Sequence, residues 1–242
     1  MSIWSPPPES KARVRQAGKR IADGNGTDED FYLVDQWRSS HGYVINTFQI
    51  WLKRKIAIKP YNVEFAQRLK RRNTVIDKLK RKNAAGDPLI ADVSAMHDFA
   101  GCRMIFEDLK DLYDFREYLN SAAVMKNVNH ALRYPREKYD YIETPKFTGY
   151  RGIHDVYRHL PRGSDRAETR KPWDGLMVEI QYRTRAQHAW ATAVEISDLT
   201  GCGKRHVKAR HWSRFHRFQT MPTVILAGTL PKAGRVWPFW AL

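Results

Sequence analysis

Residues Leu176 to Arg183 constrain the fold more than any other stretch, because apolar and polar side chains alternate from Val178 onward. Such alternation is typical of a β-strand and puts the two kinds of side chain on opposite faces of a sheet. Val178, Ile180 and Tyr182 would share one face, and Glu179, Gln181 and Arg183 the other. A helical pattern follows from Ala186 to Ser197. The polar row is therefore either a solvent-exposed face or a functional site close to a helix start.

Helical and strand patterns alternate through most of the remaining chain. We expect helices over 30–55 (broken or kinked at Gly42), 62–82, 93–98 and 109–119, and strands over 102–106 and 153–160. This order predicts an α/β (α+β) domain, a mixed central sheet flanked by helices, over residues 30–200. Residues 1–29 are polar and rich in Pro and Gly, so they predict a loose arm around one short helix, and residues 201–242 form a basic tail.

The composition supports a packed core and excludes several classes of protein. Of the 242 residues, 42% are hydrophobic, which is too many for a disordered polyelectrolyte. No apolar run approaches the roughly 20 residues needed to cross a bilayer, and the N-terminal residues lack the apolar core of a secretory signal. Two cysteines are too few for a disulfide framework or a zinc cage. We expect a cytoplasmic protein with no membrane partner.

The net charge of +16 is concentrated in two places. Residues 68–82 carry a local charge of +7, and residues 199–242 carry +8 without a single acid. Each stretch is either solvated surface or a binding site for a polyanion such as nucleotide phosphates or RNA.

Three further segments combine residue types that bind phosphate or a metal. Two glycines flank Tyr150 in the segment 146–154, where the ring could act as a stacking platform near Lys146. On a helix over 62–82, Lys70, Thr74 and Lys78 would share one face, with Arg68 close by. The His97–Asp98 pair precedes a strand, and Asp98 is better interpreted as one carboxylate of a magnesium site than as part of a metal-phosphohydrolase centre.

Taken in order, four motifs resemble the synthetase domain of the RelA/SpoT family of alarmone synthetases. They are R-x-K-x3-[S/T]-[I/V]-x2-K from Arg68 to Lys78, D-x2-G-x-R from Asp98 to Arg103, G-Y-R-x2-H from Gly149 to His154, and V-E-I-Q-x-R-T-x3-H-x-W-A from Val178 to Ala191. The resemblance covers about residues 30–200 and implies a nucleotidyltransferase-like fold. The preceding HD-type hydrolase domain and the C-terminal regulatory domains of long members have no counterpart in the sequence.

The resemblance implies transfer of the β,γ-pyrophosphate of ATP to the 3′-hydroxyl of GDP or GTP, with Mg²⁺ as cofactor. It would give Asp98 and Glu179 the catalytic and metal-binding roles. ATP would be bound by Arg68, Lys70, Thr74, Lys78 and Arg103, and the acceptor nucleotide by Lys146, Tyr150, His154, Gln181, Arg183 and His188.

The chain departs from the family pattern in its C-terminal part. Glu195 comes one residue later than the family's acid, and the following His is missing. Helices of the kind that assemble tetrameric small synthetases are not evident, so the oligomeric state is left open. The acid-free tail is either an RNA-binding extension or an out-of-frame translation.

The sequence is compatible with three functions of the chain. Alarmone synthesis is one, and pyrophosphorylation of the 3′-CCA end of tRNA by a toxin-type member is another. A tRNA acceptor would need basic surface beyond the nucleotide site. A catalytically silent nucleotide- or RNA-binding module is the third.

Overall fold

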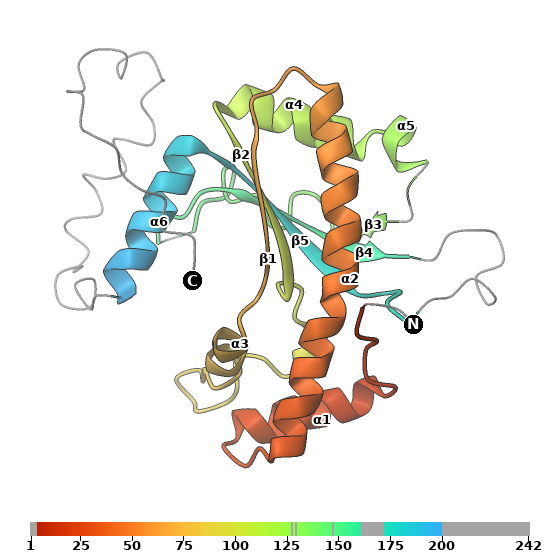
Figure 1. The fold of residues 1–242 in the computed structure, drawn as a ribbon. Helices are drawn as coiled ribbons and strands as arrows, with labels where there is room; N and C mark the ends of the chain where they lie inside the picture. Colours follow the sequence, from red (N-terminus) through yellow and green to blue (C-terminus); the bar gives the residue numbers. More distant parts are fainter. Residues whose placement is uncertain (1–3, 127, 129, 147, 161–171, 200–242) are drawn as a thin grey trace, which may run out of the picture. The chain divides into compact units, whose positions relative to one another are not determined.

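The computed structural model describes residues 4–126, 128, 130–146, 148–160 and 172–199 (Figure 1). The chain divides into two compact units, Met1–Thr192 and Ala193–Leu242, and the fold described below is that of the first unit. The tail at 201–242 and most of the loop expected at 165–174 lie outside the described residues.

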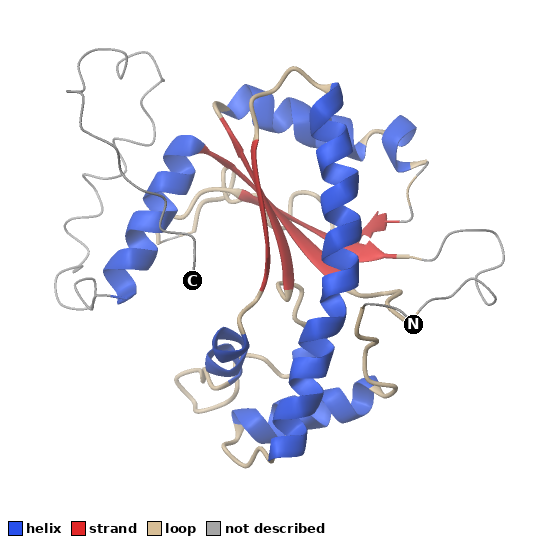
Figure 2. Ribbon diagram, in the orientation of Figure 1, coloured by secondary structure: helices blue, strands red, loops and turns tan. Residues whose placement is uncertain are grey.

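The described strands form one mixed five-stranded sheet in the order β1-β2-β5-β4-β3 (Figure 2). The parallel pair is β2–β5, and the other neighbouring strands are antiparallel. The strands are β1 Glu64–Leu69, β2 Ala100–Phe106, β3 His130–Leu132, β4 Ile153–His159 and β5 Met177–Thr184. The described helices are α1 Lys11–Ala22, α2 Asp28–Ile58, α3 Arg72–Leu79, α4 Leu109–Asn120, α5 Ala122–Met125, α6 Arg185–Leu199 and a short 3-10 helix, Val93–Ala95. The predicted fold class is confirmed.

One face of the sheet is apolar and covered by helices. Its side chains include Cys102 and Met104 of β2 and Val178, Ile180 and Tyr182 of β5, all essentially inaccessible to solvent. Helices α2 and α4 contact these two strands, and Figure 1 shows α2 crossing the sheet along much of its length. This face is the hydrophobic core, so the opposite face is left for polar chemistry.

Helix α2 starts with a reciprocal capping box in which the Thr27 hydroxyl accepts from the Asp30 amide and the Asp30 carboxylate accepts from the Thr27 amide. The predicted break at Gly42 is wrong, because α2 continues through it without interruption. A glycine costs a helix only about 1 kcal/mol relative to alanine. Burial of Trp37, Val44 and Phe48 on either side of Gly42 outweighs that cost.

Part of the expected N-terminal arm belongs to the core. Helix α1 forms where one was expected, and its residues Val14, Ala17 and Ile21 are buried in the same hydrophobic cluster as the sheet. The Ser10 hydroxyl caps its first turn by accepting from the Arg13 amide.

The predicted helix over 62–82 is wrong in its first half. Residues 64–69 form the edge strand β1, and the helix α3 covers only Arg72–Leu79. Phe65 and Leu69 are four residues apart, which fits one face of a helix, but they are also an even number apart, which fits one face of a strand. Pairing with β2 decides in favour of the strand.

Among the described residues, no helix is long and apolar enough to span a membrane.

Candidate active site

The polar row predicted on β5 continues across the sheet into its neighbours. Gln181 is paired with Arg103 of β2 on one side and with His154 of β4 on the other, so these side chains share the face that carries Glu179 and Arg183. Glu179 and Arg183 are each only 4% exposed. The row is therefore not a solvated face, and its charged groups are held in a protein environment that must satisfy them.

The carboxylate of Glu179 is surrounded by nitrogen atoms. Its Oε1 accepts from the side-chain amide of Gln181 at 2.6 Å and lies 3.1 Å from Nδ1 of His154. Its Oε2 lies 3.4 Å from Nε2 of His97. Burial alone would raise the pKa of this carboxyl, but the contacts with His154, Gln181 and His97 outweigh burial and lower it to about 2. Glu179 is therefore ionised at neutral pH.

A chain of hydrogen bonds fixes the ring of Tyr150. Arg183 donates to the Tyr150 hydroxyl through Nε at 3.2 Å and Nη2 at 2.9 Å. The hydroxyl lies 2.6 Å from Nε2 of His154. Arg183 can only donate, so the Tyr150 oxygen accepts from it, and Nδ1 on the other side of the His154 ring faces Glu179. These contacts link Arg183 to Glu179 through Tyr150 and His154.

Gly152 allows the close approach on which this arrangement depends. Its φ of +146° is one that side-chain-bearing residues rarely adopt, and a Cβ there would lie 3.1 Å from the Tyr150 hydroxyl and 3.3 Å from Cγ of Arg183. Gly152 therefore permits close packing of Tyr150 and Arg183 within the site.

Asp98 holds two lysines in a separate cluster. Its Oδ2 accepts from Nζ of Lys70 and from Nζ of Lys78, both at 2.8 Å. Burial opposes ionisation of Asp98, but the two lysines outweigh it and the pKa is below its ordinary value. The other oxygen, Oδ1, is buried and contacts no donor among the described residues. It is an unused acceptor next to two concentrated positive charges.

The residues predicted to bind ATP come from three elements, not from one face of a single helix. Arg68 lies on β1 and is paired with Gly101 of β2, so it shares the polar face with Arg103 on the neighbouring strand. Lys70 follows β1, whereas Thr74 and Lys78 lie on α3. The structure thus joins Lys70 and Lys78 through Asp98 and not through helical spacing.

The basic stretch 68–82 is only partly accounted for by this cluster. Besides Arg68 on β1, five of its cations are exposed and have no carboxylate partner among the described residues: Arg71, Arg72, Lys80, Arg81 and Lys82. The lysine pair at Asp98 therefore accounts for only part of the local charge of +7.

Lys146 lies in an aromatic loop beside the site. Its Nζ is 4.0 Å from the ring centroid of Tyr141 and 5.4 Å from that of Tyr150. Burial lowers the pKa of Lys146, while the Glu179 charge opposes this effect. His188 lies in the first turn of α6, and Glu195 is exposed and belongs to the second compact unit.

Sequence reasoning did not assign His97 to the site. The His97 ring is stacked on Tyr139, with centroids 5.7 Å apart and an interplanar angle of 29°, and it contacts Glu179. Its position directly before Asp98 was a usable signal, but the contact with β5 arises only from the tertiary fold.

The side chains around the site restrict how a metal ion could be bound. In the described part of the chain, no group of three or more His, Cys, Asp or Glu side chains could hold a metal ion. Mg²⁺ commonly binds through one or two carboxylates together with substrate phosphates. Asp98 Oδ1 fits such a site, whereas Oε1 of Glu179 is already engaged by Gln181 and His154.

Comparison with known proteins identifies the family. The model of the region found in RelA and SpoT proteins matches residues 67–197. A curated relative, GTP pyrophosphokinase YwaC of Bacillus subtilis, is 32% identical over 126 residues, which are 52% of each chain, so the chain spans about half the length of that relative.

Two solved structures share the fold. The small alarmone synthetase 1 from B. subtilis bound to its product pppGpp has a TM-score of 0.56 at 21% identity, covering 76% of this chain and 92% of that one. A GTP pyrophosphokinase family protein from Streptococcus pneumoniae has a TM-score of 0.51 at 21% identity, covering 79% and 86%. The family match spans the residues that build the polar face and the Asp98 cluster, and the chain belongs to the family of regions found in RelA and SpoT proteins.

Proposed function

We propose that the chain is an alarmone synthetase that transfers the β,γ-pyrophosphate of ATP to the 3′-hydroxyl of GDP or GTP and releases AMP. The observation that carries the proposal is a pair of carboxylates, half-buried Asp98 held by two lysines and buried Glu179 held ionised on the polar face. Family membership and the resemblance to a GTP pyrophosphokinase support it.

Lys70 and Lys78 would bind the ATP phosphates. Pyrophosphoryl transfer builds negative charge on phosphate oxygens, so cations placed beforehand stabilise the transition state. The two ammonium groups converge on one carboxylate oxygen at 2.8 Å and are therefore positioned before substrate arrives. Thr74 would add a hydroxyl from α3, and Arg68 and Arg103 would contact the adenine.

Asp98 would hold Mg²⁺ through Oδ1, and the metal would supply charge neutralisation at the transferred phosphates. Glu179 would make the second contact with the metal only after a rearrangement of Gln181 or His154. We therefore assign metal binding mainly to Asp98.

Glu179 would orient the attacking hydroxyl. A carboxylate with a pKa of about 2 stays ionised and can accept a hydrogen bond from the hydroxyl, but it is a weak base at neutral pH. In a loose transition state the hydroxyl proton is lost late, so this carboxylate contributes mainly by orienting the attacking hydroxyl and not by removing its proton. Tyr150, Lys146, Gln181 and His188 would bind the acceptor nucleotide, while His154 and Arg183 fix Tyr150 and Glu179.

The acceptor is tested by incubating the protein with ATP labelled at its terminal phosphate and with GDP, GTP or bulk tRNA. Label on GDP or GTP supports the proposal. Label on tRNA alone overturns the acceptor assignment, and no label on any acceptor overturns the enzymatic assignment in favour of a silent binding module.

A tRNA acceptor is the second candidate because one observation favours it. The five exposed cations of the 71–82 segment are not needed to bind a mononucleotide, and phosphate contacts dominate RNA affinity. Replacing Arg71, Arg72, Arg81 and Lys82 with Ala should leave labelling of GDP unchanged and abolish labelling of tRNA if tRNA is the substrate.

A further inference from the structure

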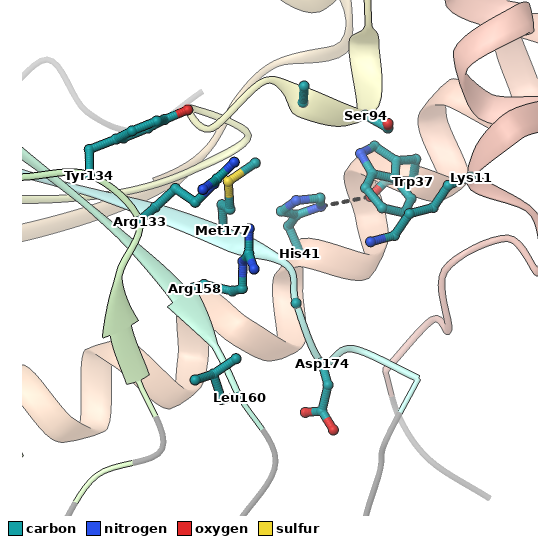
Figure 3. A pocket seen from close by; sticks show the side chains of 12 residues that line it. Lys11, Trp37, His41, Ser94, Arg133, Tyr134, Arg158, Leu160, Asp174 and Met177 are labelled. Atoms are coloured by element: carbon teal, nitrogen blue, oxygen red, sulfur yellow. Dashed lines mark hydrogen bonds between the residues drawn. The ribbon is translucent and has the colours of Figure 1, made fainter. Parts of the chain in front are cut away.

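A pocket of about 550 Å³ lies beside the candidate active site and shares none of its residues (Figure 3). Its wall is formed by α1, α2, the short helix Val93–Ala95, the end of β4 and the start of β5. It adjoins the site because Met177 in its wall is two residues before Glu179, and the Tyr134 ring lies 6.3 Å from that of His97. Its volume is in the range of ordinary small-molecule sites.

The charged groups of the pocket favour an anion. Three cations, Lys11, Arg133 and Arg158, line it together with one acid, Asp174. The Asp174 carboxylate lies 3.5 Å from Nε2 of His159. Arg133 and Arg158 have no carboxylate partner among the described residues. Two guanidinium groups from adjacent chain segments provide the donors that phosphate binding uses.

The opposite wall has unsatisfied hydrogen-bonding capacity. Trp37 is 2% exposed, and its Nε1–H has no acceptor among the described residues. Figure 3 shows its indole and the ring of His41 on the α2 side of the pocket, facing the two arginines. Buried donors in native proteins nearly always have a protein, water or ligand partner, so this one is available to a ligand in the pocket.

His41 adds an acceptor next to that donor. Its Nδ1 lies 2.8 Å from the carbonyl oxygen of Trp37, which can only accept, so Nδ1 carries the proton and Nε2 is an acceptor. Burial lowers the pKa of His41 to about 4, and the Lys11 charge adds to this effect, so the ring is neutral. The two ring centroids are 5.5 Å apart. A neighbouring donor and acceptor are what the hydrogen-bonding edge of a purine base requires.

We propose that this pocket is a second nucleotide site, which binds the phosphates of a purine nucleotide through Arg133 and Arg158 and its base through Trp37 and His41. The proposal concerns binding alone and does not depend on the transfer reaction.

Equilibrium dialysis of the full chain against labelled GDP, without ATP, tests the proposal. Tyr150→Ala removes the acceptor platform of the active site, so the GDP that this variant still binds reports on the pocket. In that background we expect one GDP per chain. Adding Arg133→Ala and Arg158→Ala should weaken this binding at least about tenfold, because each lost charge-assisted hydrogen bond is worth about tenfold or more. Trp37→Phe, which keeps most of the ring volume, should also weaken it.

Lys53→Ala together with Arg54→Ala is the matched control, since both residues are exposed on α2 and their loss removes the same two positive charges. It should leave binding unchanged. The proposal is overturned if the Tyr150→Ala protein binds no GDP, or if the arginine variants bind GDP as the control does. It is also overturned if unlabelled pyrophosphate displaces GDP from the pocket as well as unlabelled GDP does, because the base would then contribute nothing.

Discussion

Replacing Glu179 with Gln should destabilise the protein in a pH-dependent way. The folded structure lowers the pKa of this carboxyl from 4.5 to about 2. Each pKa unit corresponds to about 1.4 kcal/mol, so the ionised form is favoured in the folded state by about 3 kcal/mol. Because the folded pKa is the lower one, this stability is fully present above pH 4.5 and is lost as pH falls through about 2.

Urea unfolding of wild type and Glu179→Gln at several pH values measures the effect. At pH 7 the variant should be less stable by about 3 kcal/mol, and the difference should shrink to below about 0.5 kcal/mol near pH 2. The isosteric amide preserves packing, and Glu137→Gln, an exposed site, serves as the control that changes nothing. A constant difference at all pH values would show that the charge of Glu179 does not stabilise the folded state. Pyrophosphate transfer should fall about a hundredfold or more in Glu179→Gln at pH 7, where the variant is still folded.

Three further substitutions test other parts of the structure. Arg116→Met should cost about 3–5 kcal/mol in urea unfolding, because it leaves Asp140 and Asp155 buried without their cation; a cost below about 1 kcal/mol would contradict this. Lys78→Met should raise the KM for ATP at least about tenfold, because a lost charge-assisted contact weakens binding by that factor, and it should leave the KM for the acceptor unchanged. Equal changes in the two KM values would argue against a role of Lys78 in binding the ATP phosphates. Gly152→Ala should cost about 1–3 kcal/mol of stability through backbone strain and contact with Tyr150, and an unchanged melting temperature would show that the segment adapts.

Local patterns were sufficient to predict the fold class and the polar row of β5. Alternation along residues 178–183 depends only on neighbours in sequence, and the structure places Glu179, Gln181 and Arg183 on one face as predicted. The same reasoning failed at 64–69, because spacings of four residues fit both a helix and a strand and only pairing with β2 distinguishes them.

Contacts between distant segments could not be predicted. The lysines were expected on one helical face, but Lys70 and Lys78 meet at Asp98, which comes from a different segment. Arg116 joins α4 to Asp140 and Asp155 in a buried ionic cluster with no local signature. His97 and the pocket around Trp37 and Arg158 likewise exist only because the fold brings separate elements together.

The central claim is that both terminal phosphates of ATP leave as one unit, so the adenosine product distinguishes this reaction most directly. With ATP labelled in its adenine and an excess of GDP or GTP, we predict one AMP for each acceptor modified, and no AMP from Glu179→Gln above background. Release of ADP in place of AMP would mean that a single phosphoryl group is transferred, and it would contradict the proposed function.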